Sequence, residues 1–196
     1  CVGDFMKKWY HARPAVVIYG AVEVPKRIVK PKKNTAIFIG RLDEHTGIDI
    51  YVQAIKLIRK KIPDFTLTVY GDGPYKERIR SEGIILMGEN PYADKEIPKY
   101  EYAFVSRYLA ILEAMAAKRL VIAVYDNPVK KDYLAMPPFA QLVIIARSAD
   151  SVAKSVINYS RNEVSIEQIE HANFWVKNQT WDHLVKEYLS IWNHEK

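Results

Sequence analysis

Two glycine-containing segments could bring the backbone close to a phosphate group. Gly40 leaves room for a ligand beside the main chain, and the guanidinium of Arg41 can form a forked contact with phosphate oxygens. The segment 71–74 ends in Pro74, a residue suited to the first turn of a helix whose amino terminus would attract an anion. Read singly, each segment is equally compatible with a tight turn between a strand and a helix.

Glu113 is a carboxylate that could recognise a ribose. Its two oxygens can accept hydrogen bonds from both hydroxyls of a vicinal diol. The segment Ser106–Leu109 leads into the helix that would carry it. On position alone, a solvated residue on the outer face of that helix is the simpler interpretation.

Other common kinds of chemistry have no matching pattern. The five histidines show neither HxxxH nor HxH spacing, and no serine lies in a GxSxG segment, so we expect no metal site and no serine nucleophile. Cys1 is the only cysteine, which excludes an internal disulfide, a CxxC motif and a cysteine-rich zinc site. The polar loop Tyr125–Pro128 is interpreted as a turn.

Short apolar runs alternate with amphipathic stretches from residue 35 onward, a pattern typical of repeated βα units. Most of the runs are apolar at every position, as strands covered by helices on both faces are. The predicted strands are Ala36–Ile39, Thr66–Tyr70, Ile84–Met87, Tyr102–Ser106, Leu120–Val124 and Leu142–Ala146. Helices are predicted over Tyr51–Ile62, Tyr108–Ala116, Ser151–Ser160 and Ile166–Lys177, and after Thr180 as N-cap. We therefore expect an α/β protein with a Rossmann-like, doubly wound parallel sheet of about six strands flanked by helices.

The excess of positive charge lies near the amino terminus. The chain of 196 residues has 29 Lys and Arg against 23 Asp and Glu, a net charge of +6. Segment 1–33 holds eight of the basic residues and two of the acidic ones. The run Pro25–Lys33 is interpreted first as a solvated connector that leads into the first long strand, as charge runs usually are. An anionic membrane surface or acidic groups on a companion domain are candidate partners. Nucleic acid is a weaker alternative, since no RRM, KH or helix-turn-helix signature accompanies the charge.

A membrane-spanning helix needs about 18 consecutive apolar residues, and no apolar run of this sequence approaches that length. Residues 1–10 also lack the apolar core of a signal peptide. We therefore expect a cytoplasmic protein, with peripheral binding at the cytoplasmic membrane face as an option. A chain that opens on Cys1 suggests a fragment of a longer protein. Its many isoleucines and charges with few glutamines hint at a thermophilic source.

Several segments, taken in order, resemble the carboxy-terminal domain of the GT-B glycosyltransferases of family four, retaining enzymes that use nucleotide sugars. The similar segments are Val17–Val22 (VIPNGV in the family), Ala36–Gly47 (xxFxGRLxxxKG), Val69–Pro74 (VxGxGP), and Ser106–Tyr108 with Leu112–Ala116 (SxYEGFGxxxLEAMAxGxPVVA). Thr180, Trp181, Val185 and Tyr188 match the family's closing helix. The resemblance covers nearly the whole chain and implies half of a GT-B fold.

The resemblance also implies roles for individual residues. Arg41 would hold the donor diphosphate, with Gly40 giving access to the backbone, and Glu113 would bind the ribose hydroxyls. The backbone around Met87 and Gly88 would line the base pocket. The remaining residues of the implied nucleotide-sugar site are Thr46, Gly71, Tyr108, Leu109 and Ala110, the last two through amides at a helix amino terminus. No metal or other cofactor is expected, because basic side chains and the helix dipole would neutralise the leaving diphosphate.

The sequence departs from the family pattern in two places. Thr46 stands where the family has a lysine beside Gly47. The first glutamate and the GFG loop are absent, since Tyr108 is followed directly by Leu109. Three functions stay open: the donor-binding half of a glycosyltransferase acting on a glycan or lipid-linked acceptor, a non-catalytic nucleotide-binding or interaction domain, and a basic nucleic-acid-binding module.

The resemblance divides the chain into three parts. Residues 1–33 are expected to form an interdomain strand and a basic linker, and residues 34–178 the nucleotide-sugar-binding domain. Residues 179–196 would form a crossover helix that packs on an amino-terminal lobe outside this sequence. The aromatic stripe of that helix is also compatible with packing on its own domain. By itself, the chain is expected to be inactive.

Overall fold

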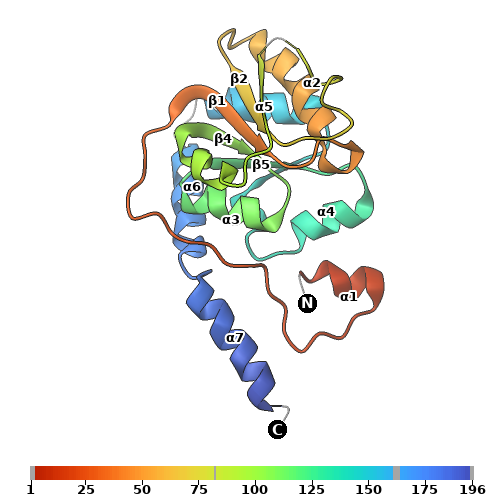
Figure 1. Ribbon diagram of the computed structural model, residues 1–196, viewed down its shortest axis with the longest axis vertical. Coiled ribbons are helices and arrows are strands. Elements are labelled where there is room, and N and C mark those ends of the chain that lie inside the picture. The colour runs from red at the N-terminus through yellow and green to blue at the C-terminus, as the bar shows by residue number, and fades with distance from the viewer. Residues whose placement is uncertain (1–2, 82, 161–163, 195–196) are drawn as a thin grey trace.

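Six strands form one parallel sheet in the order β3-β2-β1-β4-β5-β6 (Figure 1). The structure is a computed structural model that describes residues 3–81, 83–160 and 164–194, so Cys1 lies outside it. The strands are β1 (Lys32–Ile39), β2 (Thr66–Tyr70), β3 (Ile84–Gly88), β4 (Tyr100–Phe104), β5 (Leu120–Val124) and β6 (Ile144–Ala146). Every strand pair is parallel. The order is that of a doubly wound Rossmann-like fold, as the sequence predicts.

Helices cover both faces of this sheet. The α-helices are α1 (Phe5–Tyr10), α2 (Ile48–Arg59), α3 (Tyr108–Ala116), α4 (Pro128–Ala135), α5 (Ala149–Tyr159), α6 (Val164–Val176) and α7 (Trp181–His194). The described residues also form three short 3₁₀ helices, η1 (Glu44–Thr46), η2 (Ala93–Lys99) and η3 (Ala140–Leu142). Helices α2 and α5 pack together on one face, and α3 and α6 on the other (Figure 1).

Alternate residues of the strands enter two separate apolar cores. Ala36 and Phe38 of β1 point toward α2 and α5, whereas Ile37 between them joins the core under α3 and α6. Successive side chains of a strand point to opposite faces, so a strand buried on both sides must be apolar throughout. That requirement explains why the unbroken apolar runs of the sequence predict the strands closely.

The chain changes direction between β1 and β4. These strands are neighbours in the sheet, but β1 continues into α2 on one face and β4 into α3 on the other. At such a switch point, the two connections move apart and leave a crevice beyond the carboxyl ends of the strands.

The interdomain strand implied for segment 1–33 does not form. Val17–Val22 contains one isolated bridge at Ile18 and no strand, because its backbone bonds to Gly3 and Gln179 rather than to the sheet. The sequence of segment 71–74 is compatible with a helix start at Pro74 or with a tight turn, and the structure has a series of turns there. Ile79 is the only buried residue between positions 72 and 80, so this short crossover lacks the apolar face that would hold a helix. The last strand also begins later than predicted, since Leu142 belongs to η3.

Helix α7 projects away from the sheet and its covering helices (Figure 1). Thr180 caps it, with its Oγ1 accepting a hydrogen bond from the His183 amide, as predicted. The apolar stripe of α7 is largely exposed: Trp181, Val185, Tyr188, Leu189 and Trp192. Among the described residues, no helix combines the length and apolarity needed to cross a membrane.

We predict that Tyr51→Phe destabilises the fold. The buried Tyr51 hydroxyl donates to the Ile122 carbonyl at 2.8 Å and lies 3.0 Å from Ser106 Oγ, joining α2 to β5 and to the segment after β4. Loss of these buried bonds should lower the free energy of unfolding by about 1–2 kcal/mol and the melting temperature by about 2–6 °C. Tyr92→Phe, at an exposed tyrosine, is the control. Equal melting curves for Tyr51→Phe and wild type would contradict this assignment.

Candidate nucleotide-sugar site

A cavity of about 900 Å³ opens at the switch point of the sheet. Its floor comes from the segments that follow β1, β4 and β5, and the segment before β1 forms one wall. The lining residues are Phe5, Tyr10, Ile18, Tyr19, Gly20, Phe38, Ile39, Gly40, His45, Thr46, Ser106, Arg107, Tyr108, Leu109, Asn127, Val129, Lys130 and Tyr133. We call it the first cavity.

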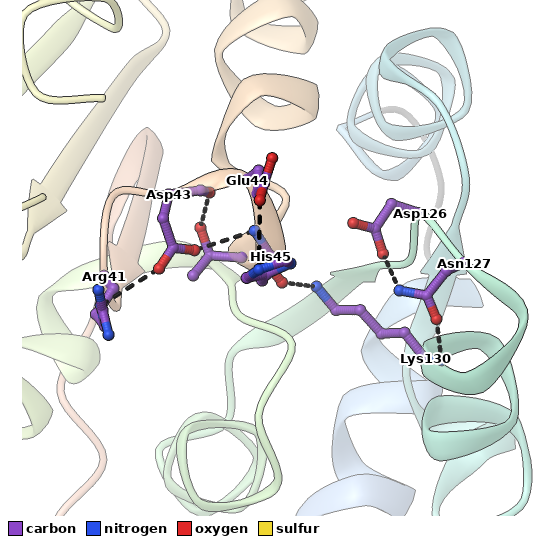
Figure 2. A network of polar contacts seen from close by, with 8 residues as sticks. Arg41, Asp43, Glu44, His45, Asp126, Asn127 and Lys130 are labelled. Atoms are coloured by element: carbon purple, nitrogen blue, oxygen red, sulfur yellow. Dashed lines mark hydrogen bonds and ion pairs between the residues drawn. The ribbon is translucent and has the colours of Figure 1, made fainter. Parts of the chain in front are cut away.

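The charged side chains that line the first cavity are basic. Arg107 and Lys130 face it together with His45, and none of the described lining residues is Asp or Glu. Lys130 is half-buried, and its ammonium donates to the His45 carbonyl at 2.7 Å (Figure 2). Burial lowers the pKa of the Lys130 amine, and nearby Asp126 opposes that shift. No carboxylate of the described residues lies within ion-pair distance of this ammonium, so two of its three protons remain available to a ligand.

The amino terminus of α3 also faces the first cavity. Its first amide, that of Tyr108, donates to the Tyr133 hydroxyl at 2.8 Å, and the two rings stack with centroids 4.0 Å apart. The next two amides, of Leu109 and Ala110, donate to no acceptor in the described chain. Free amides and the helix dipole at this end favour a bound anion.

A second, smaller cavity of about 350 Å³ shares Ile39 and Gly40 with the first. Its other lining residues are Arg41, Tyr70, Gly71, Asp72, Glu89, Asn90, Pro91 and Ala93. Gly71 has φ +148°, and a Cβ atom there would overlap the Gly40 carbonyl oxygen. The glycine therefore permits the ends of β1 and β2 to approach, with the Gly71 amide donating to the Gly88 carbonyl at 2.8 Å.

Arg41 lies in the second cavity rather than the first. Its side chain is exposed, and Nε is 3.3 Å from Asp43 Oδ2 (Figure 2). The Asp43 carboxylate also accepts a hydrogen bond from the His45 amide, which shapes the short turn η1 between the cavities. Asp43 thus connects Arg41 to the turn η1, in which the His45 carbonyl accepts a hydrogen bond from the Lys130 ammonium.

Glu113 is half-buried on α3, which packs against η2. Burial raises the pKa of its carboxyl to about 7, and the nearby Asp94 carboxylate adds to the shift. This environment excludes the fully solvated residue that position alone favours. A carboxyl that titrates near neutral pH without a cation partner is a candidate for ligand binding.

The structure brings some predicted site residues together and leaves others apart. Gly40, Thr46, Tyr108 and Leu109 line the first cavity. Gly40, Arg41 and Gly71 line the second. Gly88, Ala110 and Glu113 lie outside both linings. Gly88 accepts a hydrogen bond from the Gly71 amide, and Ala110 lies in the first turn of α3. Met87 is likewise outside and exposed on the edge strand β3.

Sequence reasoning missed several cavity residues, Lys130 above all. Asn127 precedes it as the N-cap of α4, with Oδ1 accepting from the Lys130 amide at 2.9 Å (Figure 2). A capping asparagine in the loop after a parallel strand was an available signal, because such loops lie at the ligand-binding edge of the sheet. Phe5 and Tyr10 were missed because they precede the sheet and lie in no motif, and Tyr19 was missed because the resemblance gives no role to its position in Val17–Val22. Among the described residues, no group of three or more His, Cys, Asp or Glu side chains is placed to hold a metal ion.

Comparison with solved structures gives the same fold. The chain is similar to a TarM variant from S. aureus in complex with fondaparinux, alpha-GlcNAc-glycerol and UDP (TM-score 0.73, 16% identity, 98% of this chain and 43% of that chain). It is similar to the pneumococcal O-GlcNAc transferase GtfA in complex with UDP and GlcNAc (TM-score 0.68, 15% identity, 89% of this chain and 39% of that chain). A third similar structure is the C-terminal domain of a glycosyl transferase group 1 family protein, LpcC, from Francisella tularensis (TM-score 0.60, 20% identity, 74% of this chain and 85% of that chain).

The chain spans less than half of the first two structures and most of the isolated LpcC domain. No curated protein sequence matches it. The family model described as "Glycosyl transferases group 1" matches residues 33–162, well over half of the chain and all of the parallel sheet except its first residue, Lys32. The chain therefore belongs to the group 1 glycosyl transferases, with the Rossmann-like fold of a GT-B carboxy-terminal domain.

Proposed function

We propose that this chain binds the nucleoside diphosphate sugar donor of a glycosyltransferase across both cavities. The observation that carries the proposal is the pair of cavities meeting at Gly40, one of them basic and without a carboxylate among its described lining residues. A nucleotide sugar has a neutral base at one end and two phosphates in the middle, so it suits this arrangement. The complexes of TarM and GtfA with UDP support the class of ligand.

The diphosphate would lie beside Gly40 with Lys130 as its principal cation. Lys130 Nζ is 3.9 Å from the point that a Cβ on Gly47 would occupy. The family pattern has its lysine next to that glycine, where this chain has Thr46. Lys130 thus brings a positive charge to the same turn from a different element. The free amides of Leu109 and Ala110 would add neutral donors.

The base and ribose would occupy the second cavity. Gly71 keeps its wall close to Gly40, and the Gly71 amide donates to the carbonyl of Gly88. The resemblance implies that the backbone around Met87 and Gly88 would line the base pocket, although neither residue is in the lining of the second cavity. Glu113 would accept hydrogen bonds from the ribose hydroxyls once it is ionised. Arg41, exposed and paired only with Asp43 in the described ion pairs, could turn toward the phosphates.

For the whole protein we propose sugar transfer with retention of configuration and without a metal, to a glycan or a lipid-linked acceptor. The acceptor would bind on an amino-terminal lobe. The exposed aromatic stripe of α7 supports such a partner, since apolar surface of this kind marks an interaction site. The exposed basic residues of segment 26–33 suit an anionic membrane surface at the cytoplasmic face.

We predict that Lys130→Gln weakens nucleotide binding. Calorimetric titration with UDP, GDP and ADP identifies the base, and the variant should bind the preferred nucleotide about tenfold or more weakly, because a charged hydrogen bond to phosphate is lost. Lys131→Gln is the matched control, since Lys131 is the neighbouring lysine on α4, is exposed and is absent from both cavity linings. Equal affinities for Lys130→Gln and Lys131→Gln would contradict the role of Lys130. A folded wild-type chain that binds none of the three nucleotides would contradict the proposed function.

The raised pKa of Glu113 predicts that the affinity for the nucleotide depends on pH. With a pKa of about 7 in the free protein, about one tenth of Glu113 is ionised at pH 6 and about nine tenths at pH 8. If the carboxylate form binds ribose, affinity should rise about tenfold between these two pH values. Glu113→Gln should lose this pH dependence and bind more weakly than wild type at pH 8. UDP-glucose is the suitable probe where UDP binds, because it lacks a terminal phosphate that would titrate near pH 6. An unchanged pH profile in the variant would exclude Glu113 from the site.

A further inference from the structure

The segment ahead of the sheet forms an aromatic wall of the first cavity. We call residues 3–20 the amino-terminal arm. Phe5, Tyr10 and Tyr19 of the arm line the same cavity as Lys130. Nothing in the family motifs assigns a binding role to these residues, and the family match begins only at residue 33.

The arm is anchored to the rest of the domain. Lys8 Nζ and Trp9 Nε1 both contact Asp132 Oδ2 of α4, at 2.7 and 2.8 Å. The Phe5 ring meets the Tyr133 ring edge to face, with centroids 5.3 Å apart. Within the arm, the Tyr19 hydroxyl bonds to the Asp4 carboxylate. These contacts hold α1 beside α4 (Figure 1), and Phe5 and Tyr10 of α1 line the first cavity.

Tyr10 differs from the other tyrosines of the wall. The hydroxyls of Tyr19, Tyr108 and Tyr133 are each engaged in hydrogen bonds with the protein. Tyr10 is 61% exposed and touches the Phe5 ring only at its edge, with centroids 6.4 Å apart. Its hydroxyl has no partner among the described residues. Tyr10 therefore offers a free ring face and a free polar group to a ligand in the cavity.

We propose that Tyr10, supported by Phe5, is the platform on which the sugar ring of the nucleotide sugar stacks. The inference rests on the proposed function, because phosphates held at Lys130 leave the sugar as the next part of the ligand in the same cavity. One face of a pyranose consists of C–H groups and its rim of hydroxyls. That combination matches an aromatic ring with a hydroxyl at its edge. A nucleobase would also stack on Tyr10, but the smaller second cavity beside Gly71 is the better place for a base.

The test compares a nucleotide with its sugar conjugate on the same chain. Wild type, Tyr10→Ala and Tyr10→Phe are titrated calorimetrically with UDP and with UDP-glucose, or with the corresponding pair for the preferred base. Tyr10→Ala should bind the sugar conjugate about fivefold more weakly and the nucleotide with unchanged affinity. Tyr10→Phe should keep most of the affinity, because the ring face remains. Phe174→Ala, which removes an exposed ring of α6 outside the cavity lining, is the control and should change neither value.

The outcomes separate this inference from the function on which it rests. Equal losses for UDP and UDP-glucose in Tyr10→Ala would mean that the ring stacks on the base, and would overturn the inference. So would unchanged affinity for both ligands. Failure of wild type to bind any nucleotide would overturn the proposed function and the sugar platform with it. Because Tyr10 is exposed, the variants should melt as wild type does, so loss of folding would not account for a selective effect.

Discussion

The candidate site depends on one constraint of the sheet, the opposite directions taken by the chain after β1 and β4. These strands lie side by side at the centre of the sheet, yet their following helices pack on opposite faces, so no connection covers both carboxyl ends. Both cavities open there and share Ile39 and Gly40. The buried Tyr51 hydroxyl donates to the Ile122 carbonyl and lies beside Ser106 Oγ, so it joins α2 to β5 and to the segment after β4. The two apolar cores thus fix the position of the polar loops above them.

Two partly buried ionisable groups of the domain lack a compensating partner among the described residues. Lys130 is partly buried without an ion-pair partner among the described residues, and Glu113 is partly buried close to another carboxylate, Asp94. Each arrangement opposes folding, because burial disfavours the charged form and the neighbouring groups do not fully compensate for it. Natural proteins accept such local conflicts mainly where a ligand supplies the missing partner. A diphosphate beside Lys130 and a ribose diol beside Glu113 would resolve both conflicts at once.

The sequence predicts the sheet well and the site only in part. Strands buried on both faces are unbroken apolar runs, so β2, β5 and most of β1, β3 and β4 are predicted to within a few residues. The interdomain strand implied for segment 1–33 does not form at Val17–Val22, and the residues after Pro74 form turns rather than a helix, because neither segment has a packing partner that its own sequence could reveal. Lys130 was not predicted as a site residue for a related reason, because its ammonium bonds to the carbonyl of His45, a residue 85 positions earlier in the sequence. Periodicity along one segment carries no information about such a contact.

The two departures from the family pattern have a common structural consequence. Thr46 removes a cation from the turn before Gly47, and Lys130 brings one to the same turn from α4. The missing loop after Tyr108 leaves that ring to stack on Tyr133 and to meet Tyr19 of the amino-terminal arm, whose aromatic side chains enclose the same space. A ligand responds to the position of a charge or a ring and not to the segment that supplies it. A missing motif residue therefore argues against a function only when the space it would occupy is also without an equivalent group, and Lys130 is the group that we propose as the equivalent of the missing lysine.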